Sequence, residues 1–464
     1  MNSDLFEDFS PTNKAAWINQ AKKDLKGKDF KQSLTTKLWE EIEIEPFYTK
    51  EDLAHLPEIP KNCFEKASDF SGFPSRNWVN FSAVYPKTSN KEVLNALENG
   101  ASGLILYLDG NEKLDHLLKG VQAEYISILV KPLGDPLLAM KSFLTWTEST
   151  GINEMEINGG MLWSPMDLLF SGEKSLDQAI QILKAVIASS PKSKNFHSFQ
   201  FNFSRYAEAG ASGLDELIFG FGEIIELIDQ SGIEPKVIFE KSGIFTAVGD
   251  LHFPEIAKLK AIRFFASELA FQYGIDRSPR DSFILSKTSD WSKSTLDANT
   301  NLIRQTYEAM AAVMGGANGL WVVPIQQDKA NELELRIARN VSSILIHESY
   351  LDKVADPTAG SYYLDFLVSE IMKKTKEGIQ VLEEKGGWKA AFEKNQIQDK
   401  VREARMKKQN EVLIGKATKI GVNRFSASSS LKNDLDFIPF EEEMKELKPS
   451  RVSYLVELQN QNQA

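Results

Sequence analysis

Residues 196–205, FHSFQFNFSR, alternate aromatic and polar side chains and show the element on which the fold of this chain depends. Alternation with a period of two predicts a β-strand, with Phe199 and Phe201 on one face and Gln200 and Asn202 on the other. The preceding residues 176–187 repeat apolar side chains every three or four positions, which predicts an amphipathic helix. A helix that leads into such a strand is the repeating unit of an α/β fold.

The same unit recurs on both sides of this stretch. Serine and a glutamate or glutamine at capping-box spacing, Ser89 with Glu92 and Ser175 with Gln178, mark the start of two of the helices. Segments of helical period separate eight β-rich runs, which are Trp78–Ala83, Gly103–Asp109, Tyr125–Lys131, Met155–Gly159, Phe196–Arg205, Lys236–Lys241, Ser282–Thr288 and Leu320–Ile325. Eight units in series predict an eightfold β/α (TIM) barrel, and an open doubly wound sheet is the rival.

The strand faces also suggest what fills the barrel. Outer helices need an apolar partner, so we expect the phenylalanines of the fifth run to face outward and Gln200 inward. Asn80 and Ser82 in the first run, and Glu156 and Asn158 in the fourth, extend the polar face. This pattern indicates a polar lumen that forms a channel or holds a polar ligand. Satisfied polar ladders or misassigned strand faces are the alternatives.

The pattern divides the chain into three parts. Residues 1–65 are polar and interrupted by prolines, yet carry large apolar side chains without a β/α pattern to bury them. The barrel occupies residues 66–350. Residues 351–464 form a charged helical C-terminal extension and tail. The apolar side chains of the N-terminal arm are Phe6, Phe9, Trp17, Leu25, Phe30, Leu38, Trp39, Phe47 and Tyr48.

Composition excludes several classes of protein. The net charge of −11 and pI near 5.3 disfavour a nucleic-acid or anionic-membrane surface, because both need clustered Lys and Arg. The single cysteine, Cys63, cannot form an intramolecular disulfide and has no neighbouring base to activate it. The acidic start lacks the features of a signal peptide, and no run reaches about 18 apolar residues. We therefore predict a cytoplasmic protein with no membrane or nucleic-acid partner.

Phosphate-binding and metal motifs are missing from the sequence. It contains no G-x-G-x-x-G and no Walker loop, and residues 315–319, GGANG, fit a helix C-cap followed by a turn. The five histidines are scattered and lack the spacing of metal ligands, so we predict no metal site in this chain.

Two stretches carry a specific resemblance. Residues 288–292, TSDWS, precede residues 301–316, NLIRQTYEAMAAVMGG. Residues 336–340, RIARN, precede residues 353–363, KVADPTAGSYY. Both resemble the cobalamin-dependent methylmalonyl-CoA mutase family, and weaker similarity extends over most of residues 66–425. The resemblance implies a β/α barrel independently of the strand count.

Catalytic members of this family bind adenosylcobalamin, thread CoA along the barrel axis and interconvert (R)-methylmalonyl-CoA and succinyl-CoA through radicals. The resemblance implies that this chain departs from them at reactive positions. Ser204 and Arg205 stand where those members have a Tyr-His pair, and Ala83 replaces a tyrosine that shields the radical. Trp321 and Val323 replace residues of a Leu-His-Thr-Asn run. We interpret these five positions as degenerate, so that the chain has no catalytic, cofactor-binding or metal-binding residues.

Further departures are similar in kind. Phe81 replaces a second arginine of the first strand, Lys241 and Gly243 stand where an Arg and a Ser hold CoA, and Asp290 replaces a glycine of a cobalamin-facing loop. Residues 250–252, Asp-Leu-His, match the start of the cobalamin motif Asp-x-His-x-x-Gly. The glycine position is Glu255, so we interpret the match as chance.

These comparisons predict a non-catalytic small subunit of a heterodimeric isomerase of propionate metabolism. A homologous large subunit would bind adenosylcobalamin, and this chain would have no cobalamin-binding domain. The resemblance also implies that the arm wraps around the partner, with docking onto the chain's own barrel as the alternative. A diverged barrel enzyme is the alternative function, in which Arg205, Lys241 and Glu240 would bind an anionic or acyl-CoA substrate without cobalamin.

Overall fold

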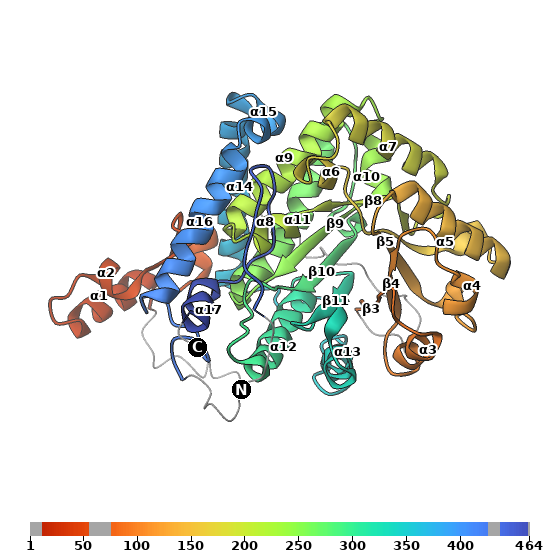
Figure 1. The fold of residues 1–464 in the computed structure, drawn as a ribbon. Coiled ribbons are helices and arrows are strands. Elements are labelled where there is room, and N and C mark those ends of the chain that lie inside the picture. Colours follow the sequence, from red (N-terminus) through yellow and green to blue (C-terminus); the bar gives the residue numbers. More distant parts are fainter. Residues whose placement is uncertain (1–11, 55–75, 426–436, 463–464) are drawn as a thin grey trace, which may run out of the picture.

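The computed structural model describes residues 12–54, 76–425 and 437–462 (Figure 1). Its large sheet is parallel throughout and has the order β7-β6-β5-β4-β3-β11-β10-β9-β8. The strands are β3 (Val79–Val84), β4 (Gly103–Leu108), β5 (Ser127–Pro132), β6 (Asn158–Met161), β7 (Phe196–His197), β8 (Phe199–Asn202), β9 (Ser242–Val248), β10 (Ile284–Thr288) and β11 (Gly319–Trp321). The two end strands, β7 and β8, are consecutive pieces of the predicted fifth strand on either side of Ser198. The sheet is therefore a nearly closed barrel, which confirms the predicted fold.

Helices cover the outside of this barrel (Figure 1). Both predicted capping boxes are present, at the start of α3 and of α7. Among the described residues, no helix is long and apolar enough to cross a membrane. The α-helices of the barrel region are α3 (Asn90–Glu98), α4 (Leu114–Leu117), α5 (Pro136–Thr150), α6 (Asp167–Phe170), α7 (Leu176–Ser189), α8 (Ser204–Glu208), α9 (Gly213–Ser231), α10 (Pro235–Lys241), α11 (His252–Gln272), α12 (Ala298–Met314) and α13 (Glu332–His347).

One predicted strand is wrong. The run Lys236–Lys241 is helix α10, which Pro235 begins at a position where a missing backbone N–H costs nothing. The sixth barrel strand is β9, which follows directly and is buried along its whole length. A strand buried on both faces shows no alternation, so its pattern gave no period-two signal.

The lumen is more apolar than the sequence indicates. The phenylalanines of β8 do face the outer helices, since Phe203, just after the strand, packs on Phe221 of α9. In β3 the assignment is reversed, because Phe81 faces inward and Asn80 donates to the carbonyls of Gly100 and Arg339 outside the barrel. A separate inner cluster fills the lumen and comprises Phe81, Ile105, Leu129, Leu162, Phe245, Leu285, Trp321 and Val323. The predicted polar channel is therefore wrong at the middle of the barrel.

Gln200 is a polar side chain that points into the lumen. Its register partner on β9 is Gly243, and a Cβ added to Gly243 would lie 2.3 Å from the Gln200 Oε1. Gly243 therefore leaves the space that the Gln200 amide occupies.

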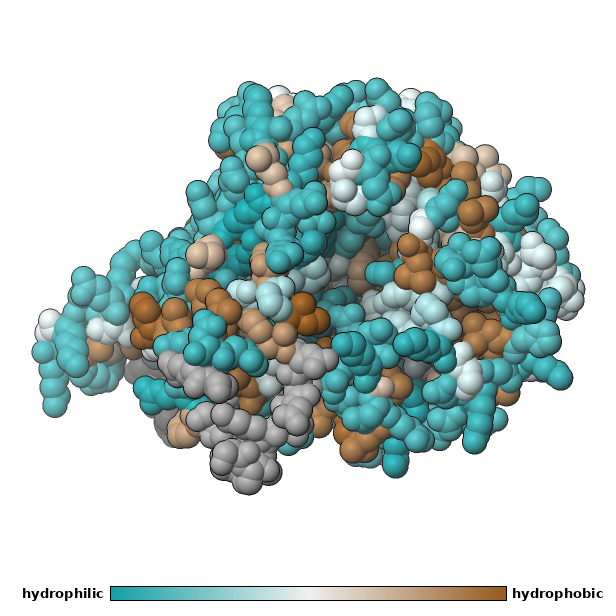
Figure 2. Space-filling model, viewed as in Figure 1, coloured by the Kyte–Doolittle hydropathy of each residue, from teal (hydrophilic) through white to brown (hydrophobic). Residues whose placement is uncertain are grey.

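The C-terminal extension packs against one side of the barrel. Its helices are α14 (Tyr362–Glu384), α15 (Gly387–Glu393), α16 (Gln396–Leu413) and α17 (Tyr454–Gln461). Helix α14 lies on α9 and α11, and Trp388 of α15 is fully buried beside Phe392. On the face in Figure 2 the surface is mostly hydrophilic, and apolar side chains collect in patches between the projecting arm and the barrel.

The described part of the arm divides into two regions. Helices α1 (Lys14–Asp24) and α2 (Phe30–Leu34) extend away from the barrel and contain no buried residue (Figure 1). Strands β1 (Thr36–Leu38) and β2 (Ile42–Ile44) form a hairpin that docks on the chain's own body, where Leu38 and Ile42 are buried. The alternative of self-docking therefore holds for the hairpin. Phe6, Phe9 and Cys63 lie outside the described residues.

Candidate functional site

A cavity of about 350 Å³ lies at the carboxyl ends of the barrel strands, where β/α barrels hold their active sites. Its floor is formed by the top of the inner cluster, from Phe245, Trp321 and Val323. Charged side chains form the wall, from Lys131 at the end of β5 to Lys287 in β10. The mouth of the barrel therefore combines an apolar base with a charged rim.

The structure brings four of the five predicted degenerate positions together at this mouth. Ser204, Arg205, Trp321 and Val323 all line the cavity. Ala83 lies on β3 and packs against the inner cluster, but it does not line the cavity. Four of the five positions therefore meet at the mouth, and the role assigned to all five stays a prediction.

Arg205 is held by two carboxylates. It donates to Glu223 of α9 at 2.6 Å and to Asp167 at the start of α6, and its guanidinium lies 4.2 Å from the ring centre of Phe170. Burial opposes the charge of Arg205, but the attraction of Glu223 and Asp167 outweighs it and raises the pKa of the guanidinium. Burial also raises the pKa of Glu223 to about 7. Two carboxylates of the chain itself therefore hold the guanidinium of Arg205 in place.

The carboxylate partners were not identified from the sequence. Glu223 lies on the buried face of α9 and also accepts from the Tyr206 hydroxyl at 2.6 Å. Tyr206 in turn accepts from the indole N–H of Trp388 at 3.0 Å. The sequence does show Glu223 within an apolar helical stripe, which suggests a buried carboxylate. This pattern does not indicate which side chain pairs with that carboxylate.

Asp290, the residue that replaces a glycine of the family, sits in a second ion network on the rim. Its carboxylate accepts from Lys287 at 2.9 Å and from Gln327 at 3.0 Å, and Lys293 lies 3.4 Å away. Its backbone N–H donates to Glu208. These lysines outweigh the cost of burial and lower the pKa of Asp290. Asp290 is therefore a paired member of the ion network on the rim of this barrel.

The three residues of the alternative enzyme do not meet. Arg205 follows the carboxyl end of β8, whereas Lys241 precedes the amino end of β9. Lys241 donates to the carbonyls of Pro191 and Ser193, and Glu240 is largely exposed beside Lys236. These groups lie at opposite ends of the barrel.

The residues present do not fit a cobalt site. His252 begins α11 and its Nδ1 lies 3.2 Å from the carbonyl of Tyr307, while the Asp250 carboxylate pairs with Lys419 at 2.7 Å. The aspartate therefore does not orient the histidine, as a metal site requires. Within the described ranges, no group of three or more His, Cys, Asp or Glu side chains could hold a metal ion.

The tail of the chain crosses the mouth. Residues 446–449 line the cavity, and Leu447 among them is buried. The backbone N–H of Ser450 donates to the carbonyl of Glu208, and that of Val452 donates to the carbonyl of Trp291, both at 2.9 Å. The tail therefore covers part of the carboxyl end of the barrel.

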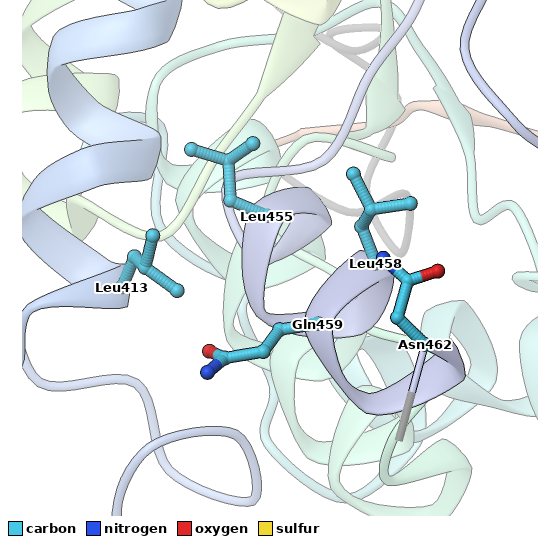
Figure 3. Close-up of a pocket in the computed structure, with 5 residues that line it drawn as sticks. All are labelled: Leu413, Leu455, Leu458, Gln459 and Asn462. Carbon is cyan, nitrogen blue, oxygen red and sulfur yellow. The ribbon is translucent and has the colours of Figure 1, made fainter. Parts of the chain in front are cut away.

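A larger depression of about 520 Å³ lies elsewhere, between the end of α16 and α17 (Figure 3). Leu413, Leu455 and Leu458 line it with the amides of Gln459 and Asn462, and all five are seen in Figure 3. It carries no titratable side chain. The barrel mouth, with its charged rim, is therefore the candidate site.

Comparisons with known proteins agree with this arrangement. The family model described as methylmalonyl-CoA mutase matches residues 107–464. The methylmalonyl-CoA mutase small subunit of Porphyromonas gingivalis is 26% identical over 93% of this chain and 72% of that protein. The methylmalonyl-CoA mutase of Cereibacter sphaeroides is 26% identical over 88% of this chain and 64% of its own length. The mitochondrial enzyme of Homo sapiens is 25% identical over 88% of this chain and 60% of its own length.

The fold and the mouth define a parallel β/α barrel with a lumen filled by apolar side chains and a charged rim. The chain belongs to the methylmalonyl-CoA mutase family. It spans less than two thirds of the Cereibacter and human relatives.

Proposed function

We propose that this chain is the non-catalytic small subunit of a heterodimeric mutase, which supports a homologous large subunit. The large subunit would bind adenosylcobalamin and interconvert (R)-methylmalonyl-CoA and succinyl-CoA. Radical chemistry is supplied by that cofactor when it is bound, and we assign it to the large chain.

The filled lumen is the observation that carries this proposal. Phe81, Phe245 and Trp321 converge inside the barrel with Leu285 and Val323, and each is at most 5% exposed. A substrate threaded along the axis would have to displace these side chains from a closely packed interior. Such packing favours a structural role over a substrate channel.

The state of Arg205 supports the same proposal. The guanidinium of Arg205 is held by Glu223 and Asp167 and brings a permanent positive charge to this position. A neutral imidazole, which the resemblance places here in catalytic members, would carry no permanent charge. The relative named as a small subunit adds support for a partner chain.

Activity of the purified chain tests the proposal. The isolated chain, given adenosylcobalamin and methylmalonyl-CoA, is expected to form no succinyl-CoA. Addition of the large chain encoded by the same organism should restore turnover. Succinyl-CoA formation by the isolated chain would overturn the non-catalytic assignment.

Co-purification tests the partner. The two chains are expected to form a one-to-one complex with an obligate-sized interface, above about 2,000 Å². Tagged chain expressed in its native host should retain a large homologous mutase chain through size exclusion. Elution as a monomer in the presence of that chain would contradict a heterodimer.

A further inference from the structure

The rim of the barrel mouth contains more than one lysine, and these differ in their surroundings. Lys287 pairs with Asp290 at 2.9 Å and lies 3.4 Å from Glu208. Lys448 pairs with Glu446 at 3.0 Å, and Arg205 is held by Asp167 and Glu223. Each of these cations therefore already has a carboxylate.

Lys131 differs from the other cations that line the cavity. It is the inward-facing residue near the end of β5, one position beyond the outward-facing Val130. Within the described residues no carboxylate lies within ion-pair distance of its amine, which lies 5.5 Å from the centre of the Tyr107 ring. Desolvation lowers the pKa of Lys131, and the attraction of Asp167, which lines the same cavity, does not offset it.

The space in front of Lys131 is suited to a small ligand. The cavity of about 350 Å³ has the aromatic rings of Phe245 and Trp321 and the side chain of Val323 at its base. Its volume is at the lower end of the range for small-molecule sites. A ligand that fits must therefore present one negative charge to the ammonium group and a short apolar body to the rings.

We propose that the barrel mouth binds a small monocarboxylate, with its carboxylate on Lys131 and its short alkyl chain against Phe245, Trp321 and Val323. The inference is independent of the proposed function, because it requires neither a partner subunit nor catalysis. The carboxylate of the ligand would form an ion pair with Lys131, the one cation lining the cavity that has no carboxylate partner among the described residues.

Titration calorimetry of the full chain with butyrate tests the site. Butyrate is expected to bind saturably, and 1-butanol, which lacks the charge, is expected not to bind. Inorganic phosphate, which lacks the alkyl chain, should compete at least tenfold more weakly. Phosphate that competes equally well would overturn the assignment to a carboxylate, and saturable binding of butanol would overturn the role of charge.

Two variants locate the carboxylate. Lys131→Met keeps the aliphatic stem and is expected to weaken butyrate at least tenfold, whereas Lys131→Arg keeps the charge and should retain binding. Lys141→Met on the exposed face of α5 is the matched control and should bind as the unsubstituted chain does. Butyrate affinity that is unchanged in Lys131→Met, or absent in the unsubstituted chain, would overturn the proposal.

A second measurement keeps the test valid if Lys131→Met fails to fold. Lysine amines of the unsubstituted chain can be dimethylated with ¹³C-formaldehyde and a borohydride reductant and observed by NMR, with the Lys131 signal assigned by its absence in Lys131→Arg. Butyrate is expected to shift that signal and leave the Lys141 signal in place. A Lys131 signal that does not respond to saturating butyrate would refute the site.

Discussion

Arg205 donates a 2.6 Å hydrogen bond to Glu223, and both side chains are buried between the barrel wall and helix α9. Asp167 holds the other end of the same guanidinium. This ion bridge occupies the position where the resemblance places a catalytic histidine. The residue that departs from the family pattern is therefore part of an ion network within this chain.

The first prediction concerns that bridge. Arg205→His should lower the free energy of unfolding by about 3–5 kcal/mol, because the buried Glu223 loses its main counter-charge. It should also restore no mutase turnover, since Trp321 and Val323 still fill the site. Urea unfolding and a succinyl-CoA assay measure the two effects.

The exposed Arg336→His is the matched control and should stay within about 0.5 kcal/mol of the unsubstituted chain. A double variant, Arg205→Met with Glu223→Gln, should recover part of the lost stability because it removes both charges. Arg205→His with unchanged stability would show that the bridge contributes nothing.

The second prediction concerns the lumen. Trp321 is 5% exposed and stacks on Phe245 with ring centres 6.4 Å apart. Trp321→Ala should cost about 3–5 kcal/mol of unfolding free energy, because the barrel strands cannot collapse into the space left behind. Tyr125→Ala, at a side chain that is 77% exposed, is the control. Equal melting temperatures for the two variants would mean that the inner cluster is not tightly packed.

The third prediction separates the two regions of the arm. Deletion of residues 1–34 removes α1 and α2, which have no buried residue, and should leave the melting temperature of the isolated chain unchanged. Deletion of residues 1–54 also removes the hairpin with buried Leu38 and Ile42, and should lower the melting temperature of the isolated chain. If α1 and α2 contact the large subunit, the shorter deletion should still weaken pairing.

Size exclusion with the co-expressed large chain measures pairing, and thermal unfolding of each isolated chain measures stability. Gly213→Ala provides a point variant of the hairpin dock, since a Cβ there would lie 2.3 Å from the Trp39 ring. It should behave like the longer deletion in the thermal test. Full pairing by the chain without residues 1–34 would contradict the assignment of these helices to the interface.

The fourth prediction concerns pH. Burial raises the pKa of Glu308 in α12 to about 8, whereas 4.5 is the ordinary value of this carboxyl. The folded chain then keeps a proton that the unfolded chain has released, so the contribution to stability is present below pH 4.5 and is lost as the pH rises to 8.

Glu308→Gln cannot release this proton. Its stability relative to the unsubstituted chain should therefore grow from pH 5 to pH 8, by on the order of 1 kcal/mol per pH unit. The exposed Glu98→Gln is the control, and urea unfolding across this pH range is the measurement. A difference between the two chains that does not change with pH would refute the raised pKa.

Much of the architecture could be predicted from local sequence patterns. Capping boxes, apolar helical stripes and seven of the eight β-rich runs correspond to helices and strands of the structure, because hydrogen-bonded ends and one-sided burial leave a periodic trace. The sixth run failed because β9 is buried on both faces. The resemblance to the family implied the barrel independently of the strand count. It also singled out Ser204, Arg205, Trp321 and Val323, which meet at the mouth of the barrel.

Only the tertiary structure decided what those residues contact. Which face of β3 points inward depends on the packing of Phe81 against side chains from other strands, and a single strand does not encode that choice. The pairing of Arg205 with Glu223, 18 residues away, and the passage of the tail over the mouth join segments distant in sequence. A periodic pattern records whether a side chain is buried, but the identity of its neighbour depends on how the whole chain closes in space.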